Sequence, residues 1–579
     1  MSLNIVTKLL ETTSDRIGHR NPQLLREWQG RLRWRNLIFV GVLSLIVQGL
    51  LLLQRLAQLP IDSRGHSLYC LHMVESSGQC KPGANGLPLL EWTVVWAELF
   101  HDLSIAMVWA LMIGGVYILA ADISKENRRG TLNFLRMSPL SGRRILIGKV
   151  LGVPILLYLG IAAMLPLHIA MGLMGSYLPA QLLAFYGLMG AIAFCFYAIA
   201  LWFTLLTKGL QGFQTWLIAG LSLGLLTMTR SQNHTGIFLD WAHYLDPMNM
   251  LVSWPIQRVS REPFFPFDQG LSPNGFSHLG WFYLRIGSHS HWFLLFALAN
   301  AIVLGLWFWV LLERKFQMPA NTAIGKQQSY GLTLYLSLMA MGLSLQEFPS
   351  EKDQWRVDLG TYLVAMTIVG VLLMFLLLPA KQHLLDWVRY RHQQSRRRHS
   401  LIRDLLCHDG SPLPLALAAN LCLMAGVLLI GIGFHNAIFP LQTETDLFIG
   451  WMLISALLLV CSLAVQWIAL SNLLHWRWAI FGTAAAILLG WPLMLGLSGV
   501  NQYQGTLTPL WLTTVYVPAV IGGCSAGEIS IAIVIYLSLI ALLSFFLSRR
   551  CQILGRSEWK MLMESKSRHP QSRHPQPQG

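Results

Sequence analysis

The fold of this chain is decided around residues 122–140, which read DISKENRRGTLNFLRMSPL. This stretch is short, polar and basic. A long apolar run precedes it at 101–121, and another follows it at 147–172. Each run can cross a bilayer as a helix, because a membrane-spanning helix needs about 17–25 residues. The stretch is therefore predicted to be a loop between two transmembrane helices.

Apolar runs of this length recur along the whole chain. Of its 579 residues, 54% are hydrophobic and 12% are charged, and the mean hydropathy is +0.51. A soluble domain carries about 25% charged residues. We therefore expect an all-α polytopic membrane protein, because a helix satisfies its own backbone polar groups in lipid. Twelve transmembrane helices are predicted, at 36–54, 101–121, 147–172, 181–206, 212–229, 291–312, 331–346, 359–380, 413–434, 447–470, 477–498 and 528–548.

The positive charges predict an orientation. With the N-terminus in the cytoplasm, 33 of the 42 lysines and arginines fall in cytoplasmic segments and 9 fall outside. This asymmetry follows the positive-inside rule and places both termini in the cytoplasm, with the chain in the plasma or inner membrane. No cleavable signal is expected, since the polar first 35 residues run directly into a span. The net charge of +15 then reflects topology and contact with anionic lipid headgroups, not nucleic-acid binding.

The spans are expected to form two six-helix halves. Residues 21–35 read as an amphipathic helix along the membrane, with Asn21 as its N-cap and Pro22 in its first turn. In chain order, the predicted parts are a cytoplasmic N-terminus (1–35), a six-helix domain (36–312) with a large outside segment (230–290), a cytoplasmic linker (313–330), a second six-helix region (331–548) and a basic, disordered tail (549–579).

A short pattern recurs at the same place in both halves. Leu132-x5-Ser138-Pro139-Leu140 follows the second span, and Leu405-x5-Ser411-Pro412-Leu413 follows the eighth. Transporters often contain internal repeats, so the pattern suggests a duplication. A chance coincidence of four residues is the alternative.

The cores of the predicted spans contain no Asp, Glu, Lys or Arg. Carriers driven by ion gradients usually place ionisable residues at membrane depth, so we expect energy to enter from elsewhere. His168 is interpreted as a hydrogen-bonded core residue. Glu98, His101 and Asp102 share one helical face by their spacing. A solvated face at the outer edge of the second span is favoured over a metal or proton site.

The chain is not expected to be an enzyme. A phosphate-binding loop needs Gly-x4-Gly-Lys-Ser/Thr, whereas Gly142 to Gly148-Lys149-Val150 has one residue too many and a valine in place of the hydroxyl. That segment is interpreted as an amphipathic approach to the third span. No nucleophile elbow or zinc-like spacing occurs, so we predict no catalytic residue and no metal or cofactor bound by this chain.

Two cysteines share the first outside loop. Cys70 and Cys80 would form a disulfide if the outside is oxidising, and a pair of free thiols is the equal alternative. Cys195, Cys422 and Cys461 fall inside predicted spans and are interpreted as small apolar residues.

Residues 122–149 resemble the coupling segment of ABC-2 type transport permeases. Members of that family often read Ile-Ser-x-Glu-Arg-Glu-Arg-Gly-Thr-Leu-Glu, followed by Ser/Thr-Pro-Leu-Ser and a basic run into Gly-Lys-Leu. The chain departs from this pattern at Arg128 and Asn133, where acidic residues are common. It shares Ile123, Ser124, Glu126, Arg129, Gly130, Thr131, Leu132, Leu135, Ser138, Pro139, Leu140, Ser141, Arg143, Arg144, Ile145, Gly148 and Lys149.

The resemblance implies a permease subunit of an ATP-binding cassette transporter, an exporter, with an additional C-terminal six-span half. A coupling helix in segment 122–146 would dock on a separate ATPase subunit that binds ATP and Mg. Leu132 and Leu135 would fill a cleft on that partner, and Arg128, Arg129 and Arg136 would meet acids around its rim. The chain would work alone or as a homo- or heterodimer with another permease. The implied coupling residues are Glu126, Arg128, Arg129, Gly130, Thr131, Leu132, Leu135, Ser138, Pro139 and Leu140.

Two other functions stay open. A twelve-span secondary carrier fits the number of predicted helices but not their uncharged cores. A membrane-embedded transferase would use polar residues of an outside loop. The candidates for it show no recognised spacing; they are Asp240, His243, Asp246 and Asp268.

Overall fold

The protein is helical throughout the part that the structure describes. Those residues are 85% helical and contain no strand, which confirms the all-α class. A computed structural model describes residues 18–59, 69, 88–210, 212–229, 237–252, 279–345, 354–393, 401–438, 445–471, 476–500, 508–517 and 524–555.

Ten of the described helices are long and apolar enough to cross a membrane, so the protein has the character of a multi-pass membrane protein. The predicted fifth span is a shorter apolar helix, Phe213–Met228. The predicted seventh span corresponds to Lys326–Ser344, which begins with the polar sequence KQQS and is not among the ten. Twelve spans in two halves of six therefore stay a prediction.

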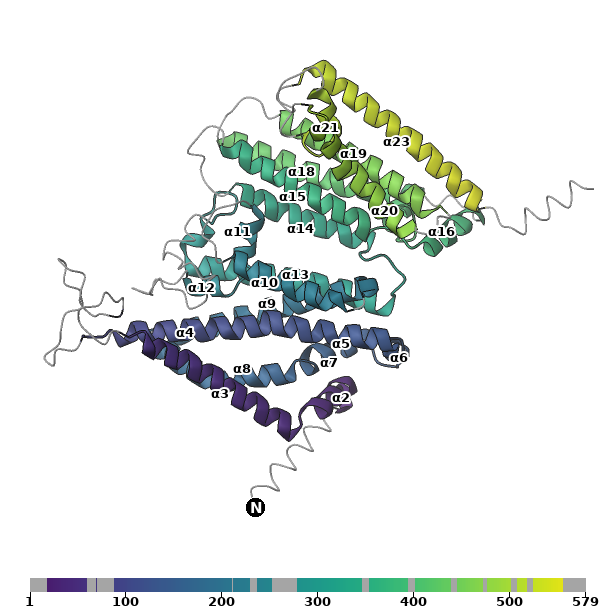
Figure 1. The fold of residues 1–579 in the computed structure, drawn as a ribbon. Coiled ribbons are helices and arrows are strands. Elements are labelled where there is room, and N and C mark those ends of the chain that lie inside the picture. Colours follow the sequence, from purple (N-terminus) through teal and green to yellow (C-terminus); the bar gives the residue numbers. More distant parts are fainter. Residues whose placement is uncertain are drawn as a thin grey trace, which may run out of the picture. The chain divides into compact units, whose positions relative to one another are not determined.

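The described residues form two compact units, one ending at Pro319 and one beginning at Ala320. The elements of the first unit (Figure 1) are α2 (Pro22–Arg31), α3 (Trp34–Ala57), α4 (Trp92–Trp109), the π-helix η1 (Ala110–Gly114), α5 (Gly115–Arg129), α6 (Thr131–Met137), α7 (Gly142–Gly152), α8 (Ile155–Met174), α9 (Pro179–Leu206), η2 (Lys208–Leu210), α10 (Phe213–Met228), α11 (Ile237–His243), α12 (Met248–Val252), η3 (Ile286–Ser288) and α13 (Ser290–Gln317).

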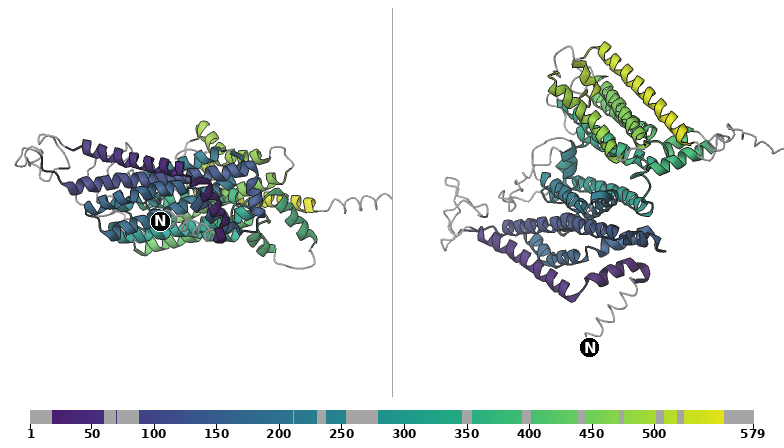
Figure 2. Two further views of the ribbon diagram at one scale, coloured as in Figure 1. Left: turned by 90° about the horizontal axis from the view of Figure 1, so that it is seen from below. Right: turned by 45° about the vertical axis from the view of Figure 1, so that its right-hand side comes forward.

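One long helical rod organises the first unit. α4, η1 and α5 run end to end over Trp92–Arg129, as both views of Figure 2 show. α4 packs against α3 and α8, whereas α5 packs against α9 and α10. α9 and α13 make the most extensive helix–helix contact of this unit. We call the end of the unit that carries α2, α6 and α7 the α6 end.

Local sequence signals set the boundaries at the α6 end. The Asn21 side chain accepts a hydrogen bond from the Leu24 N–H at 3.2 Å and caps α2, as predicted. α5 ends at Gly130, whose φ of +74° lies in the left-handed region that glycine adopts without strain. The Ser141 hydroxyl accepts from the Arg144 N–H at 3.4 Å and begins α7.

The second unit pairs its helices in the same order as the first. In the first unit α3 packs against α8 and α9 against α13; in the second, α14 packs against α18 and α19 against α23. The elements of the second unit are α14 (Lys326–Ser344), α15 (Gln354–Leu376), α16 (Lys381–Gln393), α17 (Leu401–Cys407), α18 (Pro414–Ile438), α19 (Thr445–Ala469), α20 (Trp476–Ala485), η4 (Ala486–Gly490), α21 (Trp491–Leu497), η5 (Thr508–Thr513) and α23 (Ala526–Gly555).

Several predictions fall wholly or partly outside the described residues, which begin at residue 18. Cys70 and Cys80 both lie there, so their pairing stays a prediction. Within the predicted outside segment 230–290, the described part contains only short helices. In the predicted tail 549–579, α23 continues to Gly555, and the residues after it lie outside the described part.

Candidate functional site

The short helix α6 presents two different faces. Leu132 and Leu135 are only 1% and 6% exposed, because they pack against the rest of the chain. Phe134 and Met137 are 73% and 78% exposed. The expectation that Leu132 and Leu135 meet a partner is therefore wrong, since they anchor α6 to its own unit. The exposed apolar face consists of Phe134 and Met137 instead.

Arg136 joins α6 to the end of α13. Its Nε donates to the carbonyl oxygen of Phe316 at 2.6 Å, and its guanidinium lies 5.4 Å from the centre of the Phe316 ring. Its Nη1 donates to the Asn133 Oδ1 at 2.8 Å. Burial lowers the pKa of Arg136. We expected this residue at the rim of a partner interface, but it braces α6 from within.

The other predicted residues of the segment shape the loop. The Thr131 hydroxyl donates to the Glu126 carbonyl at 3.2 Å, and the Ser138 hydroxyl donates to the Leu135 carbonyl at 2.7 Å. These bonds hold the first and last turns of α6. Arg128, Arg129, Gly130 and Pro139 are exposed and Leu140 is half-buried.

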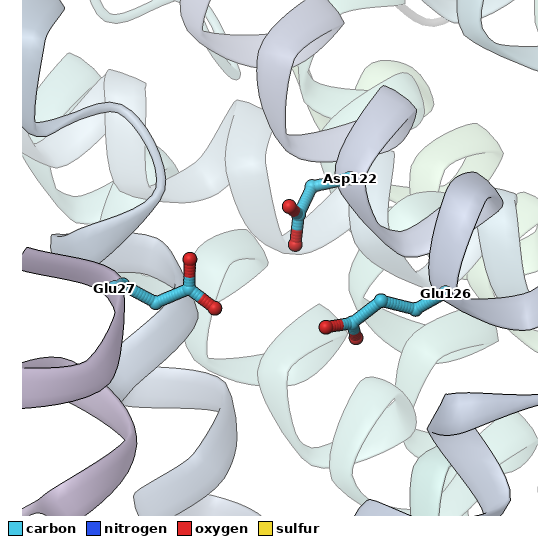
Figure 3. Close-up of side chains that lie close together, drawn as sticks. All are labelled: Glu27, Asp122 and Glu126. Atoms are coloured by element: carbon cyan, nitrogen blue, oxygen red, sulfur yellow. The ribbon is translucent and has the colours of Figure 1, made fainter. Parts of the chain in front are cut away.

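A buried charge cluster joins α2, α5 and α7 at the α6 end. Lys149 of α7 is fully buried, and its ammonium donates to Glu27 at 3.2 Å, to Asp122 at 2.6 Å and to Glu126 at 2.8 Å. Figure 3 shows the three carboxylates pointing toward one another, Glu27 from α2 and the other two from α5. Arg31 adds ion pairs to Glu27 at 3.0 Å and to Asp122 at 2.9 Å. We call these five residues the Lys149 cluster.

The Lys149 ammonium occupies the position between the carboxylates that a metal ion would take. The three carboxylates are close enough together to hold a metal ion, but the Lys149 ammonium already contacts all of them. Burial opposes the charge on Lys149 and the three carboxylates favour it more strongly, so the pKa of Lys149 is raised. Separating any of these three helices from the others would break a buried ion pair, which is energetically costly.

Sequence reasoning found only part of this cluster. It selected Glu126, but it treated Lys149 as a residue on an amphipathic approach, whereas Lys149 is fully buried. Asp122 and Glu126 are four residues apart, and this spacing could have predicted that they share one face of a helix. The contribution of Glu27 could not be predicted from the sequence, because α2 reaches the cluster only through its tertiary packing on α7.

A second buried charge cluster lies at the opposite end of the rod. Glu98 and Asp102 are buried, and the predicted solvated face is therefore wrong for them. Arg55 of α3 donates from Nη1 to Glu98 at 2.9 Å and from Nη2 to Asp102 at 2.7 Å. The Tyr69 hydroxyl donates to Glu98. Burial, together with this bond, raises the pKa of Tyr69 to about 12. These four residues are called the Arg55 cluster.

His168 is a hydrogen-bonded core residue, as predicted. It is fully buried, with Nε2 at 2.7 Å from the Ser104 hydroxyl and Nδ1 at 2.6 Å from the Tyr186 hydroxyl. Both ring nitrogens therefore have partners within the helices.

Three of the transferase candidates lie within the described residues, and two of them make local hydrogen bonds. The carboxylate of Asp246 accepts from the Thr229 hydroxyl at 2.8 Å and from the Met248 N–H at 3.0 Å, which holds a local turn. His243 lies 3.2 Å from the side-chain nitrogen of Asn249, and Asp240 is buried. Asp268 lies outside the described residues.

No family model, no curated protein and no solved structure matches this chain. The likeness of residues 122–149 to ABC-2 permeases therefore stays a prediction.

Proposed function

We propose that this chain is the membrane permease subunit of an ATP-driven transporter of the ABC-2 type, with α6 as its coupling helix. The observation that carries the proposal is the division of α6 into an anchored face and an exposed apolar face, Phe134 with Met137. A seven-residue helix cannot fold alone, so its order depends on Leu132, Leu135 and Arg136. An exposed apolar and aromatic patch with basic neighbours is typical of a protein-docking surface.

The packing behind α6 supports a route for mechanical work. A displacement of α6 would be transmitted to α5 through Gly130, which connects the two helices, and to α13 through the hydrogen bond of Arg136. The Lys149 cluster links the end of the rod to α2 and α7. Because three helices share one buried ammonium, none of them can shift without the others or without breaking a buried ion pair.

The proposed orientation places the α6 end in the cytoplasm, because the lysines and arginines gather on that side. ATP and Mg would bind the partner ATPase subunit and not this chain. Export is the direction that the family resemblance favours.

The matching order of helix pairs in the two units supports an internal duplication. A single chain would then provide both six-helix halves of a pathway, and a homo- or heterodimer with another permease is the alternative assembly.

The proposal is tested by purifying the full-length protein from its native membranes and identifying the chains that accompany it. We expect a protein with a nucleotide-binding loop to co-purify with the wild-type chain. Phe134→Asp should abolish this association, because a charge at the centre of the apolar face cannot be desolvated against the partner. Phe134→Leu should keep it.

Met318→Asp is the matched control, since Met318 is an exposed apolar residue outside α6 that follows α13. Loss of the ATPase from Phe134→Asp but not from Met318→Asp would support α6 as the docking site. Equal recovery with Phe134→Asp and with wild type would overturn the proposal.

The Arg55 cluster favours a secondary carrier as a second candidate. It buries two carboxylates and an arginine near the ends of helices long enough to span a membrane, where the sequence predicted a solvated face for the carboxylates. A carrier of this kind would take up its substrate into vesicles when a proton or sodium gradient is imposed without nucleotide, and Asp102→Asn would stop this uptake. Uptake that needs ATP and a partner ATPase and does not respond to the gradient would exclude this candidate.

A further inference from the structure

An apolar groove of about 360 Å³ lies between α8 and α9 in the first unit and is open on one side. α8 and α9 make few direct contacts with each other, because the rod packs against α8 through α4 and against α9 through α5. Leu111 of the π-helix η1 contributes to the lining between them. The lining residues are Leu111, Val150, Leu151, Tyr158, Ile161, Ala162, Leu165, Gly190, Ala193, Phe194 and Tyr197.

The two hydroxyl groups among the lining residues are already hydrogen-bonded to backbone carbonyls. The Tyr158 hydroxyl donates to the Val150 carbonyl at 2.8 Å, and the Tyr197 hydroxyl donates to the Leu111 carbonyl at 3.0 Å. A polar ligand would therefore find its hydrogen-bonding partners in the groove already engaged, whereas a hydrocarbon chain needs none. An apolar cavity of ~150 Å³ holds a benzene ring, so this groove has room for a segment of an alkyl chain.

A stripe of exposed residues on α7 leads to the groove. Arg143 and Arg144 are exposed at the start of α7, and Ile147 and Leu151 are exposed further along it. Residues 144, 147 and 151 share one helical face, and Leu151 itself lines the groove. At 1.5 Å per residue, Arg144 lies about 10 Å from Leu151 along the helix. The stripe thus changes from cationic to apolar as it enters the groove.

We propose that this groove is a binding site for an anionic phospholipid. One alkyl chain lies against Ile161, Ala162 and Ala193, and the phosphate lies at Arg143 and Arg144. The lipid comes from the leaflet at the α6 end. Basic residues beside an apolar gap between transmembrane helices are a recognised arrangement for anionic headgroups. This binding does not depend on an ATPase partner.

Photochemical labelling tests the proposal on the full-length protein in phosphatidylcholine vesicles. The probe is phosphatidylglycerol with a diazirine in one acyl chain, and peptide mass spectrometry locates the adducts. We expect adducts concentrated on the groove residues of α8 and α9. Unlabelled phosphatidylglycerol should compete for them, and extra phosphatidylcholine should not.

Two glycines of α9 provide a matched pair of variants. A Cβ added at Gly190 or at Gly187 meets no atom within 4 Å, so both positions accept a side chain, but only Gly190 lines the groove. Gly190→Phe should reduce groove labelling about tenfold, whereas Gly187→Phe should leave it unchanged. Replacing Arg143 and Arg144 with Gln should remove the preference for phosphatidylglycerol.

Adducts spread evenly over the lipid-facing helices of the wild-type protein would overturn the proposal, as would equal competition by both lipids. Equal labelling of Gly190→Phe and Gly187→Phe would also overturn it. If a variant fails to fold, the distribution of adducts on the wild-type protein is enough to show whether the lipid binds in the groove.

Discussion

Lys149 is the residue on which the α6 end depends most. Its ammonium lies within hydrogen-bonding distance of Glu27, Asp122 and Glu126, and the side chain has no contact with solvent. Removing one partner of a buried ion pair costs more than the pair contributes, because the remaining charges keep their desolvation penalty.

Lys149→Met should therefore destabilise the first unit by about 3–5 kcal/mol, because it leaves three carboxylates close together with less positive charge. The melting temperature of the detergent-solubilised protein measures this effect. Lys125→Met is the control, since Lys125 is an exposed residue of α5. The same melting temperature for both variants would contradict the structural role of the cluster.

Lys326 provides a test of pH dependence in the second unit. It is buried, and its ammonium donates to the carbonyl oxygens of Leu405 at 2.7 Å and Pro412 at 3.0 Å. Burial lowers the pKa of Lys326 to about 8, although Asp409 opposes the shift. Between that value and the ordinary 10.5, the unfolded chain binds more protons at this site than the folded one. Stability therefore rises with pH across this window.

We expect the melting temperature of the wild-type protein to rise with pH between about 8 and 10.5. The melting temperature of Lys326→Met should not show this rise. The comparison concerns the slope against pH, because the substitution also changes the stability itself. Parallel slopes for the two proteins would show that Lys326 keeps an ordinary pKa.

At the scale of elements, apolar runs were enough to predict most helices, because length and hydropathy alone define a span. The cap at Asn21 also followed from local chemistry. The loop predicted for residues 122–140 is wrong for most of that stretch, because α5 continues to Arg129, ends at Gly130 and is followed by α6. The buried face of each helix could not be predicted from the sequence in the same way. Glu98 and Asp102 are buried because Arg55, 43 and 47 positions away, neutralises them. No local pattern carries that information.

The buried face of α6 could not be predicted from local sequence either. Its leucines were expected to face a partner, but a seven-residue helix needs its apolar residues for anchoring to its own unit. Phe134 and Met137 do not belong to the family pattern, so the pattern could not predict their exposure.

The Arg55 cluster should hold α3 to α4. Arg55→Met leaves Glu98 and Asp102 buried without their cation and should lower stability by about 3–5 kcal/mol. The double variant with Asp102→Asn should recover part of that loss, since one of the two charges is then removed. Thermal unfolding in detergent measures both. A double variant that is less stable than Arg55→Met would contradict the ion pair.

At the scale of the whole molecule, the described residues separate at Pro319–Ala320 into two units. Both residues are exposed. Domain boundaries usually fall in exposed linkers that few contacts cross. The sequence predicted a linker here from its polar composition, but the shared order of helix pairs could not be predicted, because it depends on contacts between distant segments.

A protease site inserted between Pro319 and Ala320 tests this division. After cleavage, both fragments should keep their helical circular dichroism and melt as the intact protein does. The same site inserted after Ser176, in the turn between α8 and α9, should unfold the first unit. Loss of helicity after cleavage at Pro319 would show that neither unit is self-sufficient.

The most direct test of the account measures ATP hydrolysis. The proposed ATPase partner is separated from this chain, and its rate of ATP hydrolysis is measured with and without the chain restored in lipid vesicles. We predict that the wild-type chain and Met318→Asp stimulate hydrolysis and that Phe134→Asp does not. Stimulation by Phe134→Asp equal to that by the wild type would contradict the claim that α6 receives the work of the ATPase.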